Sequence, residues 1–382
     1  MTAQLAQLLL DTLQLRPEPT RGDLAARWSR LQATGRAAAI ATWLGWEGGE
    51  QWLLRRLADG GALSAAPPGL VQALRRAARD DAKAGMAIDA EAVLVLRVLS
   101  ELDVPCVLLK GPARRAGAPS LALADARRTH DVDLLVPEVD VERAWRALLA
   151  RGYAPTVRYT PASAPPEESE LWGPSPYHPR PLLRPGGAAV ELHVTTGSGL
   201  APTEAWNRIT STAQEVQWQG LPARVPSPTE LLWHALTHAD VCQSFAWRLR
   251  HWLDAASVLA AQPVDWSAIH SRLGSPELPH RASALRWLSM ASRLAGIALP
   301  PEMATQERLP LERLVEWRLA VFARHAAGAQ WTEKLIDEGT RVAVGLGLAP
   351  LVAGRSWPIH VRRRSASLLA RGRYCLWRVV RR

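Results

Sequence analysis

Lysine, phenylalanine and cysteine are scarce in this 382-residue chain. The 46 lysine and arginine residues include only three lysines, Lys83, Lys110 and Lys334. The three cysteines lie far apart in no metal-ligand spacing, which argues against a disulfide framework and a cysteine zinc site. A sparse, odd number of cysteines is typical of a reducing compartment, so we expect a cytoplasmic protein.

Long apolar runs and a signal sequence are also lacking. The longest apolar stretch, residues 342–354, is rich in glycine and is shorter than the roughly 20 residues that a membrane span needs. The N-terminal apolar run has no basic segment before it and is interrupted by Asp11, which is not typical of a signal peptide. We therefore expect no transmembrane segment.

The net charge of +10 is concentrated near the C-terminus. No acidic residue follows Glu338, whereas nine arginines occur from residue 355 onward: Arg355, Arg362, Arg363, Arg364, Arg371, Arg373, Arg378, Arg381 and Arg382. Two interpretations stay open for this Arg-rich tail. It is either a solvated basic segment or a contact surface for anionic lipid, nucleic acid or another polyanionic partner.

Helical patterns occupy both ends of the chain. Apolar residues recur at three- and four-residue spacing in the N-terminal part, which predicts helices through residues 24–40, 50–57, 70–78 and 87–102. In the C-terminal part, Ser227 is followed by Pro228 and Glu230, the pattern of a capped helix start. Helices are expected from there onward, with breaks near prolines 263, 276, 279, 300 and 301.

The middle of the chain predicts strands instead. Short apolar runs bounded by turn residues are typical of buried strands, and they occur at residues 104–109, 131–137 and 188–194, with a hairpin at 214–225. A helix over 139–151 is expected to end at Gly152, and 155–187 is expected to be a long loop that can include one short strand. The fold class predicted is α+β, a small mixed sheet flanked by N-terminal and C-terminal helical regions.

Two aspartates in the second predicted strand, Asp131 and Asp133, project from one face because side chains alternate along a strand. Two neighbouring carboxylates repel each other unless a cation lies between them. Glu191, in another predicted strand, adds a third acid. Mg²⁺, or Mn²⁺ in its place, binds carboxylates together with substrate phosphate oxygens. We therefore predict these three acids as metal ligands and catalytic residues of a phosphoryl-transfer site, although an isolated Asp-x-Asp is also typical of a strand end or turn.

The preceding strand ends at Lys110 and Gly111. A glycine there lets the backbone approach a phosphate, and Lys110 could pair with the phosphate charge. Arg127 and Arg128, just before Asp131, could hold triphosphate oxygens. A plain strand-to-helix turn and surface arginines are the alternative interpretations.

Histidines add weaker signals. His193 shares a strand face with Glu191 and could orient it or contact phosphate. The alternative is a hydrogen-bonded histidine with a structural role only. His234 and His238 have the i, i+4 spacing of a zinc pair, but no third ligand is evident in the sequence, so zinc is not predicted.

Taken in order, these motifs resemble the uncharacterised bacterial nucleotidyltransferase family of the polymerase-β-like superfamily. The resemblance covers roughly residues 85–260 and depends on Leu108-Leu109-Lys110-Gly111, Arg127, Asp131-Val132-Asp133-Leu134-Leu135-Val136, Glu191-Leu192-His193, Ser227 to Leu232, His238, Arg248 and Trp252-Leu253-Asp254-Ala255-Ala256.

The resemblance implies a nucleotidyltransferase palm in which the three acids bind metal and Glu191 helps to activate an acceptor hydroxyl. It also implies that four residues at matching positions contact the nucleotide: Lys110, Gly111, Arg127 and His193. His238 and Asp254 would border the acceptor or nucleobase pocket. One departure concerns the turn. Where the wider superfamily has Gly-Ser or Gly-Gly, this chain has Lys-Gly-Pro.

The domain organisation expected has four parts: an N-terminal helical region (1–84), a nucleotidyltransferase α/β core (85–226), a C-terminal helical domain (227–340) and the basic tail (341–382). The function expected is transfer of a nucleoside monophosphate from a nucleoside triphosphate, such as ATP, to an unknown hydroxyl acceptor, most simply a small molecule. Nucleotidylation of a protein or peptide, and a non-catalytic nucleotide- or anion-binding module, are the alternatives.

Overall fold

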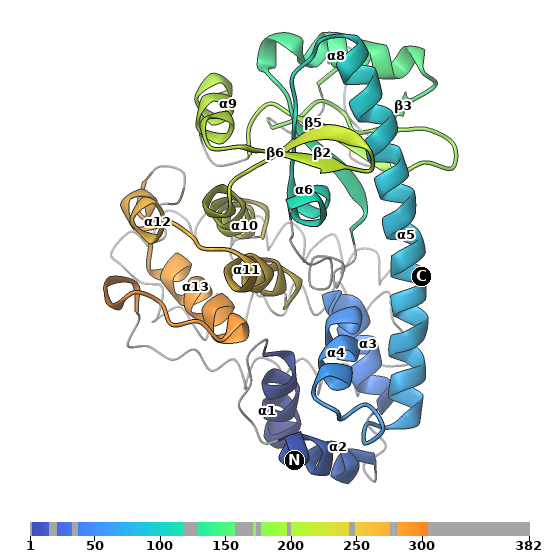
Figure 1. Cartoon of the computed structure of the whole chain (residues 1–382), viewed down its shortest axis with the longest axis vertical. Coiled ribbons are helices and arrows are strands. Elements are labelled where there is room, and N and C mark those ends of the chain that lie inside the picture. The colour runs from blue at the N-terminus through green and yellow to red at the C-terminus, as the bar shows by residue number, and fades with distance from the viewer. Residues whose placement is uncertain are drawn as a thin grey trace, which may run out of the picture. The chain divides into compact units, whose positions relative to one another are not determined.

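The computed structural model has an α+β architecture with a small sheet between helices (Figure 1). It describes residues 2–14, 21–32, 37–117, 129–156, 171–172, 177–196, 200–243, 249–275, 278 and 281–304. The Arg-rich tail and Arg127 therefore lie outside the described residues. No helix among the described residues is long and apolar enough to span a bilayer.

The N-terminal part is helical, as predicted. Its helices are α1 (Thr2–Leu13), α2 (Arg21–Gln32), α3 (Ala37–Glu47), α4 (Glu50–Asp59) and α5 (Pro68–Glu101). Helix α5 packs against α3 and α4 along one part of its length and against the sheet strand β2 and helix α8 along another (Figure 1). The prediction of two separate helices over 70–78 and 87–102 was wrong, because α5 is continuous across them, and the proposed boundary after residue 84 falls inside this helix.

The sheet has five short strands in the order β1-β2-β5-β4-β3. Their bounds are β1 (Val107–Leu108), β2 (Asp131–Leu135), β3 (Ala154–Pro155), β4 (Leu182–Leu183) and β5 (Ala189–His193). Strands β2 and β5 are parallel, whereas β1 pairs antiparallel with β2 and β4 pairs antiparallel with β3 and β5. The sheet is therefore mixed, as the sequence predicts.

Because side chains alternate along each strand, the two faces of this sheet carry different residues. Val132, Leu134 and Val190 belong to a buried apolar core that also includes side chains of α5 and helix α8 (Glu138–Ala150). On the opposite face, Leu135 packs with Ile209 of helix α9 (Pro202–Ser211) in a second, smaller cluster. The rest of this second face carries the acids of β2 and β5.

A buried carboxylate links α5 to the sheet on the core side. Glu91 accepts a hydrogen bond from the Tyr153 hydroxyl, and it accepts two from Arg184 Nε, at 2.8 and 3.1 Å. The backbone of Gly187 lies so close that a Cβ there would be 2.5 Å from Glu91 Oε2. This Glu91 cluster ties the turn between β4 and β5 to the long helix.

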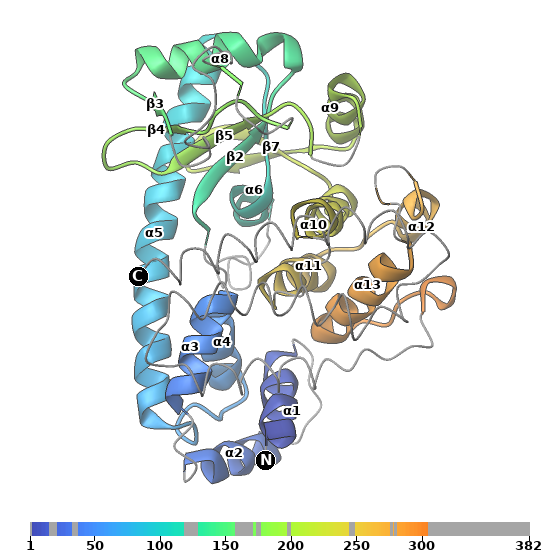
Figure 2. The ribbon, with the colours of Figure 1, turned by 180° about the vertical axis from the view of Figure 1, so that it is seen from behind.

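The remaining elements follow the predicted pattern. The hairpin consists of β6 (Gln214–Trp218) and β7 (Leu221–Val225), which form a separate two-stranded sheet. The helices after it are α10 (Pro228–Gln243), α11 (Leu249–Ala261), α12 (Trp266–Arg272), α13 (Arg281–Ala295) and the short 3-10 helix η2 (Pro301–Met303). Seen from behind, α10 lies beside α6 (Lys110–Gly117), and the two helices are in contact (Figure 2).

Two predicted helix ends are confirmed in detail. The hydroxyl of Ser227 accepts a hydrogen bond from the Glu230 backbone N–H at 3.3 Å, which is the N-cap contact expected at the start of α10. Gly152 has a φ of 87°, the left-handed conformation that lets glycine end α8 after its C-cap residue Arg151.

Candidate active site

The acids of β2 and β5 come together because the two strands are parallel and in register. Asp133 pairs with Glu191 across the two strands, and Leu135 pairs with His193. Residues two apart on a strand share a face, so Asp131, Asp133, Glu191 and His193 all project from the face opposite the main core. Asp133 is fully buried and Asp131 is half-buried.

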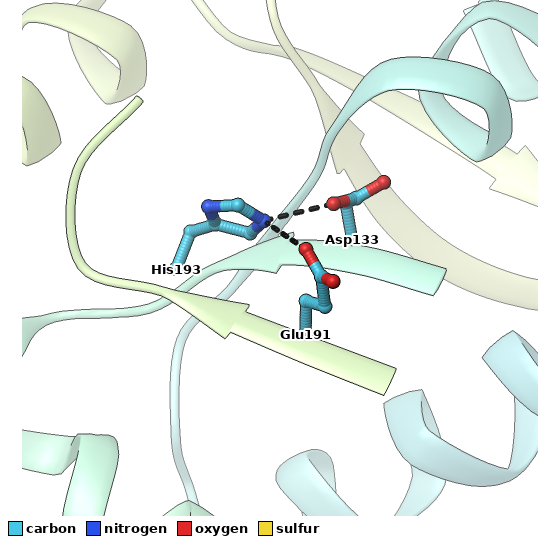
Figure 3. A group of neighbouring side chains, drawn as sticks. All are labelled: Asp133, Glu191 and His193. Carbon is cyan, nitrogen blue, oxygen red and sulfur yellow. Dashed lines mark hydrogen bonds and ion pairs between the residues drawn. The ribbon is translucent and has the colours of Figure 1, made fainter. Parts of the chain in front are cut away.

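A histidine nitrogen lies between the two buried carboxylates (Figure 3). His193 Nε2 is 2.8 Å from Asp133 Oδ1 and 3.3 Å from Glu191 Oε2. One ligand atom from each of these three side chains lies within 4.8 Å of the other two. Asp131, which the sequence analysis predicts as a ligand together with Asp133 and Glu191, is not one of these three side chains, and its role as a metal ligand stays a prediction.

Lys110 supplies a second positive charge. Its Nζ donates to Asp133 Oδ1 at 2.6 Å and lies 4.0 Å from Glu191 Oε2. The residue is the first of α6 and has a φ of 46°, in the left-handed region that non-glycine residues rarely adopt. The backbone N–H of Leu109 donates to the Asp133 carbonyl at 2.9 Å, which holds the start of α6 beside β2.

The ionisation of this group follows from the balance between burial and charge pairing. Burial disfavours the charged form of Asp133, yet the Lys110 ammonium and the hydrogen bond from His193 hold the pKa of Asp133 well below its usual range. Burial lowers the pKa of His193 and Lys110, but the neighbouring carboxylates outweigh burial, and both pKa values are raised. Burial also disfavours the charged form of Glu191, but the hydrogen bond from His193 and the nearby positive charges lower the pKa of Glu191.

The residues present fit a divalent cation. Asp133 Oδ2 is buried and has no hydrogen-bond partner among the residues that the structure describes, although a buried carboxylate oxygen without a partner is costly. Carboxylate oxygens are the ligands that Mg²⁺ and Mn²⁺ prefer. A cation held by Asp133 and Glu191 would satisfy this oxygen and offset the repulsion between the two carboxylates.

The comparisons with known proteins agree with this chemistry. The model of a family described as uncharacterised nucleotidyltransferase matches residues 36–294. The chain belongs to this nucleotidyltransferase family. No curated protein matches the chain. Among solved structures, an antigenic nucleotidyltransferase-like protein from Paracoccidioides brasiliensis is similar at 16% identity and a TM-score of 0.33, over 57% of this chain and 95% of that chain. This low TM-score gives the likeness no weight for fold or function.

One residue of the candidate site was missed by the sequence analysis. His178 Nε2 lies 3.8 Å from Glu191 Oε2, and its ring centroid lies 5.0 Å from that of His193. Burial, followed by the His193 charge, lowers the pKa of His178. The residue falls in the Pro- and Ser-rich segment that the sequence predicts as a loop, so no periodic pattern or motif marked it.

The glycine of the Lys110-Gly111 turn has a packing reason in the structure. A Cβ on Gly111 would lie 1.9 Å from the Thr129 Cγ2 methyl, so only glycine fits there. Thr129 is in turn held by Arg115 Nη1, which donates to its hydroxyl at 2.9 Å. The predicted approach of a phosphate to Gly111 stays a prediction.

Other predicted residues lie on helices α10 and α11. The rings of His234 and His238 are 6.1 Å apart, and His238 is 5.9 Å from His251. Asp254 forms a 2.6 Å ion pair with Arg114 of α6, so it links α11 to the helix that carries Lys110. The roles of His238 and Asp254 at an acceptor or nucleobase pocket stay predictions.

Proposed function

We propose that this chain is a bacterial-type, metal-dependent nucleotidyltransferase of the polymerase-β-like superfamily. It transfers a nucleoside monophosphate from a nucleoside triphosphate to a hydroxyl acceptor, most simply a small molecule. The observation that carries this proposal is the pair Asp133 and Glu191, brought side by side by the parallel register of β2 and β5. Membership of the nucleotidyltransferase family supports it.

In the proposed reaction, the acceptor hydroxyl oxygen forms a bond to the α-phosphorus while the bond between that phosphorus and the β-phosphate oxygen breaks. Pyrophosphate leaves, and the hydroxyl proton passes to Glu191 or to solvent. Mg²⁺ or Mn²⁺, held by Asp133 and Glu191 with Asp131 on the same strand face, would neutralise the charge that develops on the phosphate oxygens.

The protein's own cations have complementary roles in this proposal. Lys110, Gly111 and Arg127 contact the triphosphate, and His193 orients Glu191. Support for Lys110 comes from its position, since it lies at the N-terminal end of α6, where unpaired backbone N–H groups favour an anion. Its ion pair with Asp133 keeps the ammonium at the carboxylates that would hold the cation.

The test is calorimetric binding of ATP, GTP, CTP and UTP with and without Mg²⁺. We expect one triphosphate to bind in a metal-dependent manner, and Asp133→Asn to weaken that binding about 100-fold because an amide is a poor metal ligand. Glu142→Gln is the matched control, since Glu142 is an exposed carboxylate on α8 that pairs with Arg146. The control should bind as the wild type does.

The same titrations separate the alternatives. Metal-independent binding that survives Asp133→Asn would favour a non-catalytic nucleotide- or anion-binding module. Metal-dependent binding followed by labelling of a protein rather than a small molecule would favour protein nucleotidylation. If the basic tail binds nucleic acid, that affinity should fall steeply with salt.

A further inference from the structure

The group of ligand atoms at the candidate site includes an imidazole nitrogen where three carboxylates were predicted. Asp133, Glu191 and His193 each contribute one atom to a group whose members lie within 4.8 Å of one another (Figure 3). A cation that binds both carboxylates therefore meets His193 Nε2, which is the atom that faces them.

The other ring nitrogen of His193, Nδ1, makes no contact among the described residues that would prevent it from carrying the ring proton while Nε2 binds a cation. Nδ1 is buried without a hydrogen-bond partner among the described residues. When Nε2 of a histidine binds a metal, the ring is in the tautomer that has its proton on Nδ1 and a lone pair on Nε2.

A second imidazole faces the same group from outside the two strands. His178 Nδ1 is 2.7 Å from the Pro179 carbonyl oxygen, and because a carbonyl only accepts, Nδ1 carries the proton. In the neutral ring, Nε2 then carries a lone pair, and this atom is the one near Glu191 Oε2. The segment is held in place because the Val194 backbone N–H donates to the Tyr177 carbonyl at 2.9 Å.

The lone pair of a neutral His178 Nε2 and the Glu191 carboxylate repel each other unless a cation or a hydrogen-bond donor lies near both. Mg²⁺ binds oxygen ligands and water in preference to nitrogen, whereas first-row transition metals accept imidazole readily. Mn²⁺ is the weakest binder of that series and, like Mg²⁺, also accepts carboxylate ligands. Nitrogen ligation is therefore indicated by a preference for Mn²⁺ over Mg²⁺ that depends on His193.

We propose that this site prefers a first-row transition-metal ion such as Mn²⁺ to Mg²⁺, with His193 Nε2 as a direct ligand beside Asp133 and Glu191, and with His178 supporting it. This inference rests on the proposed function, because it names the cation and the ligand set of the same site.

The experiment uses the full chain and the metal ions alone. Calorimetric titrations should give Mn²⁺ an affinity at least about tenfold higher than that of Mg²⁺. His193→Asn should weaken Mn²⁺ binding on the order of 100-fold and largely remove the preference, since it removes the nitrogen ligand. His270→Gln is the control, because His270 lies on α12, interacts with Arg281 and is no part of the site; its Mn²⁺ affinity should stay at the wild-type value.

A spectroscopic measurement on the wild type covers the case in which His193→Asn fails to fold. Electron spin-echo spectra of the Mn²⁺-loaded protein should contain the modulation of a directly bound imidazole nitrogen. Spectra without that modulation, or equal affinities for Mn²⁺ and Mg²⁺, would overturn the inference.

A separate variant tests the role of His178. His178→Gln should weaken Mn²⁺ binding about threefold and leave the nitrogen modulation from His193 in place, which is the smaller effect expected of a supporting neighbour. An unchanged Mn²⁺ affinity would remove His178 from the proposal.

Failure of the inference is distinguishable from failure of the proposed function. A wild-type protein that binds Mg²⁺ and a triphosphate together, but shows no preference for Mn²⁺ alone, would keep the function and refute the cation assignment. A protein that binds Mn²⁺ through His193 but binds no triphosphate would do the reverse.

Discussion

Two buried clusters of charged residues in this protein differ in how their charges are matched. In the Glu91 cluster, one carboxylate accepts hydrogen bonds from Tyr153 and Arg184. In the cluster around Asp133, two buried carboxylates share Lys110 and His193, while Asp133 Oδ2 and His193 Nδ1 have no partner among the described residues. A matched cluster stabilises a fold, whereas buried groups left without partners indicate a site for a ligand.

The largest expected difference between the clusters is their response to a divalent cation. A ligand that binds only the folded state adds about 2.7 kcal/mol of stability at 100 times its Kd. Mn²⁺ should therefore stabilise the wild type and Glu91→Gln by the same increment, and Asp133→Asn by much less. Thermal unfolding with and without Mn²⁺ measures this, and an equal increment in Asp133→Asn would mean that the ion binds elsewhere.

Without any cation, the Glu91 cluster should contribute more to the free energy of unfolding than an exposed ion pair elsewhere on the protein does. Glu91→Gln is expected to lower the free energy of unfolding by about 2 kcal/mol, because it leaves Tyr153 and Arg184 without their shared acceptor. This loss is smaller than that expected for a fully buried ion pair, because the Arg184 side chain is 34% exposed and solvent screens its charge. Urea unfolding measures the loss, and Glu101→Gln, which removes an exposed pair with Arg151, should change stability very little.

Gly187 lies against the Glu91 cluster, whereas Gly111 follows Lys110 in the chain and packs against Thr129. Gly111 therefore allows packing to be separated from function. Gly111→Ala should cost about 1.5 kcal/mol because its Cβ would overlap the Thr129 methyl. Adding Thr129→Ser removes that methyl, keeps the hydroxyl that Arg115 contacts, and should recover most of the stability. Triphosphate affinity should stay reduced in the double variant if the Gly111 backbone approaches a phosphate. Recovery of affinity together with stability would mean that Gly111 serves packing alone.

The smallest expected effect concerns Tyr153. Burial and the hydrogen bond to Glu91 raise the pKa of Tyr153. A raised pKa favours the neutral phenol in the folded state, so this stability is present below the ordinary tyrosine pKa of about 10 and is lost as the pH rises above it. Tyr153→Phe should cost about 1 kcal/mol near pH 8, and the gap to the wild type should narrow above pH 10. Urea unfolding between pH 8 and 11 would show a constant gap if the phenol did not contribute in this way.

The strand pattern was enough to predict the acids but not all of their neighbours. Alternation places Asp131 and Asp133 on one face of β2, and Glu191 and His193 on one face of β5, and both predictions needed only local spacing. The meeting of the two pairs needs the parallel register of the strands. The ion pair between Lys110 and Asp133 needs the antiparallel pairing of β1 with β2, which no local pattern reveals. His178 reaches Glu191 from an irregular segment, where periodicity carries no information.

The continuity of α5 was not predicted for a related reason. Apolar spacing fades over residues 79–87 of α5, where most side chains are exposed or half-buried. A helix without a packed face still continues when both of its ends are anchored, as α5 is against α3 and α4 and against β2 and α8. Local hydrophobic periodicity records where a helix is covered, not how far it extends.

The parallel register of β2 and β5 also sets how this protein can change over evolutionary time. Because side chains alternate, inserting or deleting a single residue inside β5 would turn Glu191 and His193 toward the apolar core and abolish the site at one step. No gradual series of geometries lies between the two arrangements. Length variation among descendants of this chain should therefore be absent from the two strands, while point substitutions around them adjust the site by degrees.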